Sequence, residues 1–268
     1  MTINEFIKKI EYSEDAICTY EKMHKILSKD YLVKKREYYE NEELFLQNLK
    51  EQMGENYYPA ILYYFTNFAF ELKGTYLKMG FTEEEYLHTF CDLKTWNEMC
   101  VLETGICGLR ETGWLTSHMH AGIVRFGRMQ FQPEVLEEDL VVKDTVIEAG
   151  TEILNVHIPF GGAIGVEEVQ DSLNRAKAHY GEKYVHAESW LLDPTLQKYL
   201  SPTSNILSFA NRFTVYKLEE HYSIERFVFL VSLENKNDYV AKNAFQQRIK
   251  DALIRGEKFY SGYGVMKL

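Results

Sequence analysis

Cysteine is scarce in this sequence, and the cysteines that occur are not paired. The 268-residue chain has four of them, at Cys18, Cys91, Cys100 and Cys107. They form no C-x-x-C pair and follow no regular spacing, so a disulfide framework is not predicted. All four lie in segments with helical patterns, which favours reduced thiols in the core of a folded protein.

A cluster of metal-binding residues is also lacking. His118 and His120 are separated by one residue, a spacing that can chelate a metal ion from a strand. No cysteine or carboxylate cluster accompanies these two histidines. We therefore expect no metal cofactor.

Basic residues are too few for a nucleic-acid-binding surface. Lys and Arg total 30, against 40 Asp and Glu, which gives a net charge of −10. Only the run from Lys34 to Arg36 is locally basic, and we interpret it as a solvated helix face. Because proteins bind nucleic acid through a stripe of positive charge, nucleic acid is not an expected partner.

Long apolar runs are lacking as well. The aromatic stretch over residues 57–70 is interrupted by Pro59 and Asn67, and it falls short of the roughly 20 apolar residues of a membrane span. We expect a buried central helix there, and no membrane partner. The first five residues show no basic segment leading into an apolar core, so no secretory signal is predicted and a cytoplasmic location is expected.

The residues that are present indicate a folded protein of two domains. Apolar residues make up 46% of the chain and charged residues 26%, and aromatic residues are abundant, with 19 Tyr and 16 Phe. This length and composition suit a substantial core. The pattern changes near residue 115, so we predict a helical domain over residues 1–116 and a second domain over residues 117–268.

The first domain reads as a bundle of five or six helices. Thr2-x-x-Glu5 and Thr82-x-x-Glu85 are capping boxes that mark helix starts. Helical spacing covers residues 13–27, 41–53, 57–79 and 83–107. The apolar stripes of these helices are best explained as core. We find no catalytic constellation in this half.

The second domain reads as strands with a few helices. Strand patterns cover residues 123–131, 135–147, 153–158, 184–192, 209–218, 227–233 and 260–268. Helical patterns cover residues 166–180 and 244–254, and a short helix is predicted from Pro194 to Tyr199. The first three strand patterns follow each other directly, which favours antiparallel pairing.

The most informative segment joins a strand to a helix through a glycine-rich turn. The aliphatic run over residues 153–158 ends at Pro159, and the turn contains Gly161, Gly162 and Gly165. A helix start beside such a turn offers N–H groups to an anion, and a pyrophosphate would fit. Glu167 and Glu168 would repel phosphate unless they point outward, and a tight connection with no ligand is the alternative interpretation.

Several segments of the second half resemble those of a known group of proteins. The runs Arg125 to Phe131, Ile153 to Pro159 and Ser189 to Pro194, with Ser204 to Ile206, are similar to those of bacterial acyltransferase-domain proteins. Those proteins pair a helical N-terminal domain with a C-terminal domain like the GNAT superfamily of N-acyltransferases. The resemblance covers essentially the whole chain. It implies an α+β fold, in which the helical domain precedes a mixed, mainly antiparallel sheet flanked by helices.

The resemblance also implies a coenzyme A site. In the superfamily, loop amides after a central strand bind the pyrophosphate of coenzyme A, and the strand pairs with pantetheine. Ile158 stands where the superfamily has Gln or Arg. The implied cofactor-binding residues are Ile158, Phe160, Gly161, Gly162, Ala163, Ile164 and Gly165.

Acyl transfer to an amine needs a base for the ammonium proton and an acid for the departing thiolate. By resemblance, His157 is the first candidate base and Glu188 the second, with His186 two residues before it. Ser189 is a candidate donor, and Tyr199 is the nearest tyrosine for the usual acid. For each of them, a structural role in a half-buried strand is the alternative.

The function that follows is that of an acyl-CoA-dependent N-acyltransferase. It would move an acetyl or other acyl group from a coenzyme A thioester to a small-molecule amine by direct transfer. The alternative is a degenerate GNAT-like module that binds a metabolite or a protein partner. A hydrolase triad of Ser189, His186 and Glu188 is disfavoured because strand neighbours point to opposite faces. The oligomeric state, a homodimer included, is left open.

Overall fold

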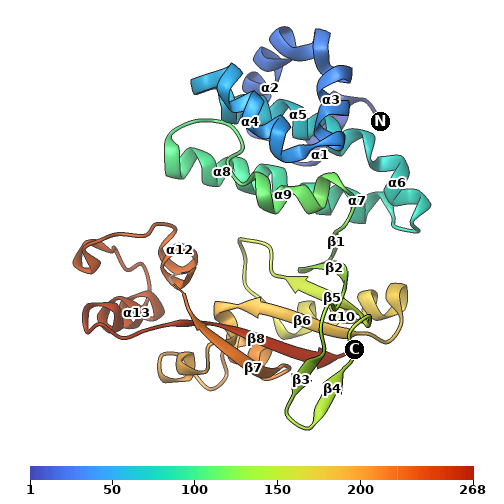
Figure 1. Cartoon of the computed structure of the whole chain (residues 1–268). Helices are drawn as coiled ribbons and strands as arrows, with labels where there is room; N and C mark the ends of the chain where they lie inside the picture. Colours follow the sequence, from blue (N-terminus) through green and yellow to red (C-terminus); the bar gives the residue numbers. More distant parts are fainter. Residues whose placement is uncertain (222) are drawn as a thin grey trace. The chain divides into compact units, whose positions relative to one another are not determined.

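The chain divides into two compact units, Met1–Arg125 and Phe126–Leu268. The structure is a computed structural model that describes residues 1–221 and 223–268. Figure 1 shows helices alone in the first unit up to α9 and the sheet in the second. The α+β class, with a helical region followed by a mixed, mainly antiparallel sheet, is confirmed.

The first unit is built from short and medium helices. Its α-helices are α1 (Ile3–Lys9), α2 (Glu14–Leu27), α3 (Tyr31–Glu40), α4 (Glu42–Met53), α5 (Tyr57–Glu71), α6 (Lys73–Lys78), α7 (Glu83–Phe90), α8 (Asp92–Thr104) and α9 (Thr112–Met119). Two 3₁₀ turns, η1 (Ser28–Asp30) and η2 (Gly54–Asn56), connect some of them. Both predicted capping boxes are confirmed, at Thr2 with Glu5 and at Thr82 with Glu85.

Helix α5 is the centre of this unit. Ten of its residues are buried, among them Tyr63, Tyr64 and Phe65, and it packs against α1, α2, α4, α8 and α9. The prediction of a buried helix in the aromatic stretch is confirmed. Within the described residues, none of the helices has the length and apolar character needed to cross a membrane.

Two predicted helices are each divided. The segment 57–79 breaks at Leu72, whose N–H contacts the carbonyls of both Phe68 and Ala69. The segment 83–107 breaks at Cys91, whose N–H likewise contacts two carbonyls. Such bifurcated bonds tighten the last turn of a helix and let the chain change direction. The described part of this unit therefore has nine α-helices, and the prediction of five or six was too low.

The second unit is organised around a six-stranded sheet with the order β1-β2-β5-β6-β8-β7. Its strands are β1 (Val124–Phe126), β2 (Met129–Val135), β5 (Glu152–His157), β6 (Tyr184–Ser189), β7 (Thr214–Glu220) and β8 (Tyr260–Lys267). β5 and β6 pair in parallel, whereas β2–β5, β6–β8 and β7–β8 pair antiparallel.

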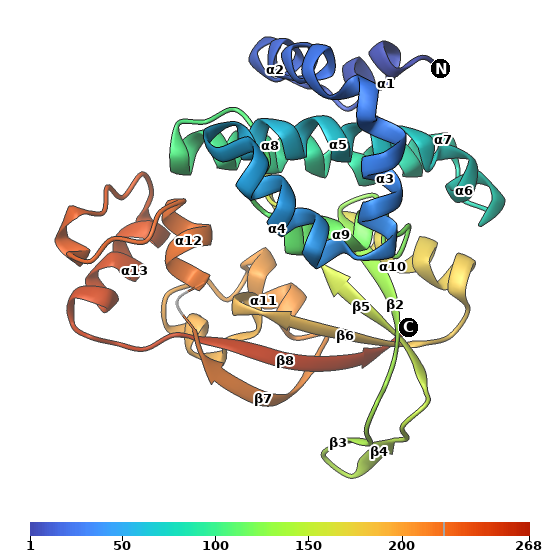
Figure 2. The same cartoon turned by 45° about the horizontal axis from the view of Figure 1, so that its top comes forward.

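One predicted strand is replaced by a separate hairpin. Residues 135–147 do not continue as one strand: β2 ends at Val135, and β3 (Leu140–Val142) pairs with β4 (Thr145–Ile147). The turn between them contains Lys143 with a φ of 53°, a conformation that a continuous strand does not allow. Figure 2 shows this hairpin extending away from the large sheet.

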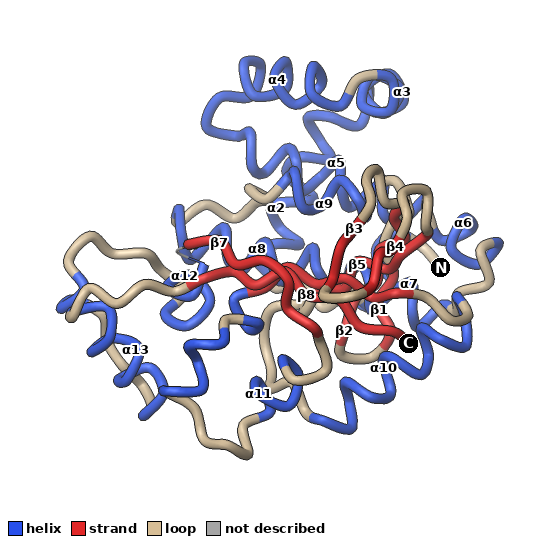
Figure 3. The backbone as a smooth tube through the Cα atoms, turned by 60° about the horizontal axis from the view of Figure 1, so that its bottom comes forward, coloured by secondary structure: helices blue, strands red, loops and turns tan. Residues whose placement is uncertain are grey.

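Helices cover one face of the sheet. Helix α10 (Val166–Tyr180) buries Val169, Leu173 and Ala176, and it ends at Gly181, as its spacing predicted. Helix α11 (Asn205–Ala210) lies beside α10, and Figure 3 shows both on the same side of the strands. The remaining helical pieces are η3 (Trp190–Leu192), η4 (Pro194–Lys198), α12 (Ser223–Phe229), η5 (Lys236–Asp238) and α13 (Ala244–Ile254).

Two further strand predictions were wrong. Residues 209–218 begin as the end of α11, where Phe209 is buried, and become strand only at Thr214. The predicted strand over residues 227–233 is also wrong at its start, because residues 227–229 are the last residues of helix α12. The reason is the spacing of Ile224 and Val228, which both pack into one apolar cluster. Positions four apart share a helix face, so this packing favours the helix over strand propensity.

Candidate functional site

The two parallel strands at the centre of the sheet separate at their C-terminal ends. Their pairing covers three residue pairs, from Ile153 with Tyr184 to Asn155 with His186. β5 nevertheless remains paired with β2 up to His157, and β6 remains paired with β8 up to Ser189. The C-terminal ends of parallel strands are where open α/β sheets bind ligands.

The glycine-rich turn follows β5 directly. Gly161 and Gly162 have φ values of 89° and 73°, which L-residues with a side chain rarely adopt. Gly161, Gly162 and Ala163 are exposed, and a Cβ added at either glycine would meet no atom within 4 Å. The glycines are thus required by backbone conformation, and space beside the loop is open.

One guanidinium contacts the carbonyl side of this loop. Arg128 donates from Nη1 to the Pro159 carbonyl at 2.8 Å and from Nε to the Ala163 carbonyl at 3.0 Å. Its Nη2 donates to the carbonyls of Gly161 at 2.8 Å and Gly162 at 3.3 Å. In a trans peptide the C=O and the following N–H point in opposite directions. The amides of residues 162–164 therefore face away from Arg128.

The acidic residues at the start of α10 differ in their effect on the loop. Glu168 accepts a hydrogen bond from the Gly165 amide at 3.0 Å, so this donor is already satisfied. Glu167 is exposed. Among the described residues, the amides of Gly161 to Ile164 donate no hydrogen bond. The N–H groups of residues 161–164 can therefore donate to a ligand. The N–H of Gly165, which is nearest the helix, already donates to Glu168.

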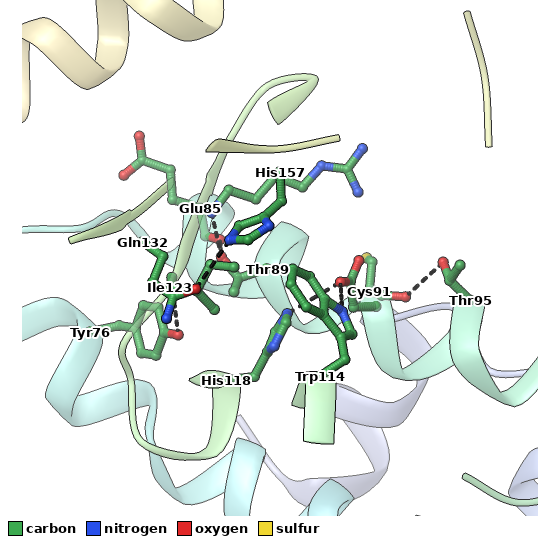
Figure 4. A network of polar contacts seen from close by, with 12 residues as sticks. Tyr76, Glu85, Thr89, Cys91, Thr95, Trp114, His118, Ile123, Gln132 and His157 are labelled. Carbon is green, nitrogen blue, oxygen red and sulfur yellow. Dashed lines mark hydrogen bonds and ion pairs between the residues drawn. The ribbon is translucent and has the colours of Figure 1, made fainter. Parts of the chain in front are cut away.

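His157 ends β5 immediately before the loop. Its Nε2 lies 3.1 Å from Oε1 of Gln132, on the neighbouring strand β2, and Figure 4 shows the two side chains pointing toward each other. Because an amide oxygen only accepts, Nε2 is the donor in this contact.

Glu188 and Ser189 end the neighbouring strand β6. Continuing the register of Asn155 with His186, His157 and Glu188 lie on the same face of the sheet. Glu188 is exposed. Ser189 lies on the opposite face, where its hydroxyl oxygen accepts from the Leu191 amide at 3.1 Å. That contact uses the oxygen, so the hydroxyl proton can still be donated.

His186 belongs to an aromatic group on the same face as Glu188. Its Nε2 lies 2.9 Å from the hydroxyl of Tyr216, and its ring lies 6.2 Å from that of Tyr263 between centroids. Burial lowers the pKa of His186, and the nearby Glu188 carboxylate partly opposes this shift. Burial also raises the pKa of Tyr263, as do the carboxylates of Glu219 and Glu188.

Tyr199 has mainly apolar surroundings. It packs in the apolar cluster with Leu196, Ile224 and Ile249, and its hydroxyl donates to the carboxylate of Glu257. Burial, followed by this hydrogen bond, raises the pKa of Tyr199 to about 12. The structure brings His157, Glu188, Ser189 and the loop to one end of the sheet and places Tyr199 in a different environment.

His118 and His120 do not have the strand geometry of a metal site. His118 lies in α9 and His120 follows it. His118 Nε2 lies 3.2 Å from Oδ2 of Asp92, which also accepts from Trp114 Nε1 at 3.1 Å (Figure 4). The described residues contain no group of three or more His, Cys, Asp or Glu side chains suited to a metal ion.

The prediction for the cysteines is only partly right. All four are free thiols, as expected from their spacing. Cys100 is buried, but Cys18 is exposed on α2 and does not belong to a core. Helical spacing alone did not show which face of α2 this residue occupies.

The sequence patterns did not predict which residues surround the site. Arg128 lies in a segment used for the resemblance, but nothing local indicates that it reaches a loop 31 to 35 residues away. Gln132 and Glu134 alternate along β2, and they contact His157 and Asn155. This alternation of polar residues was the available signal for a polar sheet face.

Two family models match the chain. A model described as a GNAT-like C-terminal domain matches residues 123–266, and one described as an N-acyltransferase N-terminal domain matches residues 1–121. The chain belongs to the GNAT-like acyltransferases. The resemblance of the sequence to this group is therefore confirmed, and so is the enzyme class of acyltransferase. A search of curated protein sequences gave no match.

Solved structures of acyltransferases are similar to this GNAT-like protein. A mutant acyltransferase in complex with octanoyl-CoA has a TM-score of 0.74 and 19% identity, over 99% of this chain and 87% of that chain. An acyltransferase in complex with decanoyl-CoA and teicoplanin has 0.72 and 19%, with the same coverage of 99% and 87%. A third, in complex with decanoyl-CoA, has 0.68 and 20%, over 100% of both chains. These likenesses show a shared fold.

Proposed function

We propose that this GNAT-like acyltransferase transfers an acyl group from an acyl-CoA to an amine. The observation that carries the proposal is the divergence of β5 and β6 directly beside an exposed glycine loop whose amides face away from Arg128. The diverging strands offer backbone groups to the pantetheine arm, and the loop offers N–H donors to the diphosphate. Ile158 to Gly165 would form this cofactor site.

The end of the sheet supports direct transfer. His157 takes a proton from the substrate ammonium, and Glu188 is the alternative base. The amine nitrogen then forms a bond to the thioester carbonyl carbon, and the carbon–sulfur bond breaks. The nitrogen releases its second proton in this step, and that proton replaces the one that the acid gives to the departing thiolate. Ser189 lies at the end of β6 with its proton available to donate to the departing thiolate. The products are an amide and free coenzyme A.

The acid role is assigned to Ser189 in preference to Tyr199. The Tyr199 hydroxyl already donates to the Glu257 carboxylate, so its proton is committed to that contact. Ser189, by contrast, ends β6 where the two strands separate. Its side chain projects from the face opposite Glu188, so the base and the acid would approach the thioester from opposite sides. Tyr199 serves instead to fix the packing around η4.

The acceptor is proposed as a cationic amine. Glu188 is exposed on the polar face of the sheet, where its carboxylate can attract an ammonium group. The similar acyltransferases were solved with octanoyl- or decanoyl-CoA, and one of them with teicoplanin. By analogy, we propose a medium-length acyl chain, and an amine borne either on a small molecule or on a larger peptide scaffold.

Binding and turnover test this function separately. Calorimetry should show that the protein binds coenzyme A, octanoyl-CoA and decanoyl-CoA. Incubation with a panel of amines should release coenzyme A and yield an amide, both detected by mass spectrometry. Binding without any amide formation would support a ligand-binding module, and absence of binding would refute the cofactor assignment.

The His157→Gln variant tests the base. We expect kcat to fall about 10²- to 10³-fold, because a positioned base accelerates proton transfer by this order. The dissociation constant for acyl-CoA should change by less than about threefold, since His157 is not one of the proposed loop donors. His88→Gln, at an exposed position of α7, is the matched control. An unchanged kcat in His157→Gln would eliminate this residue as the base.

A further inference from the structure

Arg128 contacts the loop after β5 through its side chain and helix α10 through its backbone. Its side chain contacts four carbonyls of the loop, from Pro159 to Ala163. Its backbone N–H donates to the hydroxyl of Ser172 in α10 at 3.0 Å. Ser172 is fully buried and donates in turn to the Glu168 carbonyl at 2.8 Å. Arg128 therefore links the loop to the helix that follows it.

The loop needs such a link because its own sequence does not fix its conformation. Gly161 and Gly162 have positive φ values and no neighbours within 4 Å of a Cβ position. Glycines lose more conformational entropy on ordering than other residues. Ile158, at the position where the superfamily has Gln or Arg, is an apolar residue with no side-chain hydrogen-bonding group. The planar guanidinium of Arg128 donates to several loop carbonyls, and it thereby supplies the conformational restraint that the loop sequence does not provide.

The hydrogen bonds from Arg128 to the loop carbonyls also affect the N–H groups of the same peptide units. Each carbonyl that accepts from a cation polarises its peptide unit, which makes the N–H on the other side a better donor. The planar peptide directs those N–H groups away from the guanidinium, and the loop that carries them is exposed. The result is a set of oriented donors with a positive charge behind them.

We propose that Arg128 is a positioning residue that holds loop 159–165 in the conformation that binds the diphosphate of coenzyme A. This inference rests on the proposed function. Arg128 acts through the loop backbone, so its effect is confined to ligands that carry the diphosphate. A thioester of pantetheine alone, which has the same reacting group and no diphosphate, should be used equally well with or without it.

Two variants and two thioesters test the proposal. In Arg128→Gln and Arg128→Lys, the KM for decanoyl-CoA should rise about tenfold or more, because displacement of a positioning group commonly costs one to two orders of magnitude. The KM for decanoyl-pantetheine should stay within about twofold. Lysine keeps the charge, but its three N–H donors are on one nitrogen and cannot satisfy four carbonyls, so Arg128→Lys should resemble Arg128→Gln. Arg36→Gln, at an exposed position of α3, is the control.

The outcomes that would overturn the proposal are distinct. Full activity of Arg128→Lys would show that charge alone matters, and an equal loss with both thioesters would show a general defect. A ligand-free measurement accompanies the kinetics: NMR order parameters of Gly161 and Gly162 should fall in Arg128→Gln from rigid values of about 0.85 toward 0.6. Unchanged order parameters would refute the positioning role even if the wild-type protein bound no coenzyme A, a result that would separately refute the proposed function.

Discussion

The hydroxyl of Tyr199 illustrates how environment decides the use of a side chain. A tyrosine after the diverging strand is the expected acid by resemblance, and sequence alone offers Tyr199. In the folded protein this hydroxyl is committed to Glu257, whose pKa is lowered by hydrogen bonds from Tyr199 and then Arg255. A group that stabilises a neighbouring carboxylate is poorly suited to release its proton to a thiolate.

Substitution at Tyr199 and Ser189 separates the two candidate acids. Tyr199→Phe should leave kcat within about twofold, because the hydroxyl is committed to Glu257, whereas Ser189→Ala should lower kcat about 10²-fold, as does loss of other preorganised donors. Steady-state kinetics with an acyl-CoA and an active amine measures both. If Tyr199→Phe were the inactive variant, the assignment to Ser189 would be reversed.

The elements of this fold were predictable where local spacing and caps decide the structure. Helix α10 and helix α13 have the bounds that their apolar periodicity indicates, and Thr2 and Thr82 begin helices as their capping boxes require. Where non-local packing decides, prediction failed. α12 has strand-like composition, but Ile224 and Val228 pack on one helical face against residues of α13 and η4.

Strand β8 packs closely against η3, and no local sequence pattern predicts this contact. A Cβ added to Gly262 would lie 2.7 Å from the Cβ of Leu192 and 2.8 Å from its carbonyl oxygen. Gly262 is also the register partner of Ser189. A side chain at position 262 must therefore displace either β8 or η3, which follows β6 directly.

Gly262→Ala should lower the free energy of unfolding by roughly 1–3 kcal/mol, the usual effect of overpacking. It should also lower kcat, since Ser189 shifts with its partner strand. Urea unfolding and kinetics measure the two effects. Gly74→Ala, in α6 where a Cβ meets no atom within 4 Å, is the control and should be neutral or stabilising by about 0.5–1 kcal/mol. Equal stability of the two variants would contradict the predicted clash.

Across the whole molecule, the candidate site was predictable as far as it is contiguous in sequence. His157 and the loop after it form one segment, and a strand, turn and helix in succession indicate an anion site. The partners of that segment come from strands distant in sequence: Gln132 from β2, and Arg128 from the turn before it. Pairing register brings them together, and register depends on the complete sheet.

The stability of the protein against acid is expected to depend on His186. Burial in the folded state lowers the pKa of this imidazole below its ordinary value of 6.5. The unfolded chain therefore binds the proton first as the pH falls, so the free energy of unfolding decreases from about pH 7 downward until the folded state also protonates. Glu188, whose charge raises the pKa of His186, limits this loss.

Urea unfolding at pH 7.5 and pH 5 should therefore show a larger loss of stability in the wild-type protein than in His186→Gln. The other titrating groups are common to both proteins and cancel in the comparison. In Glu188→Gln, removal of the opposing carboxylate should make the acid-side loss larger than in the wild type. Equal losses in the wild type and His186→Gln would mean that His186 can be protonated in the folded state without cost, and that its contact with Tyr216 survives protonation.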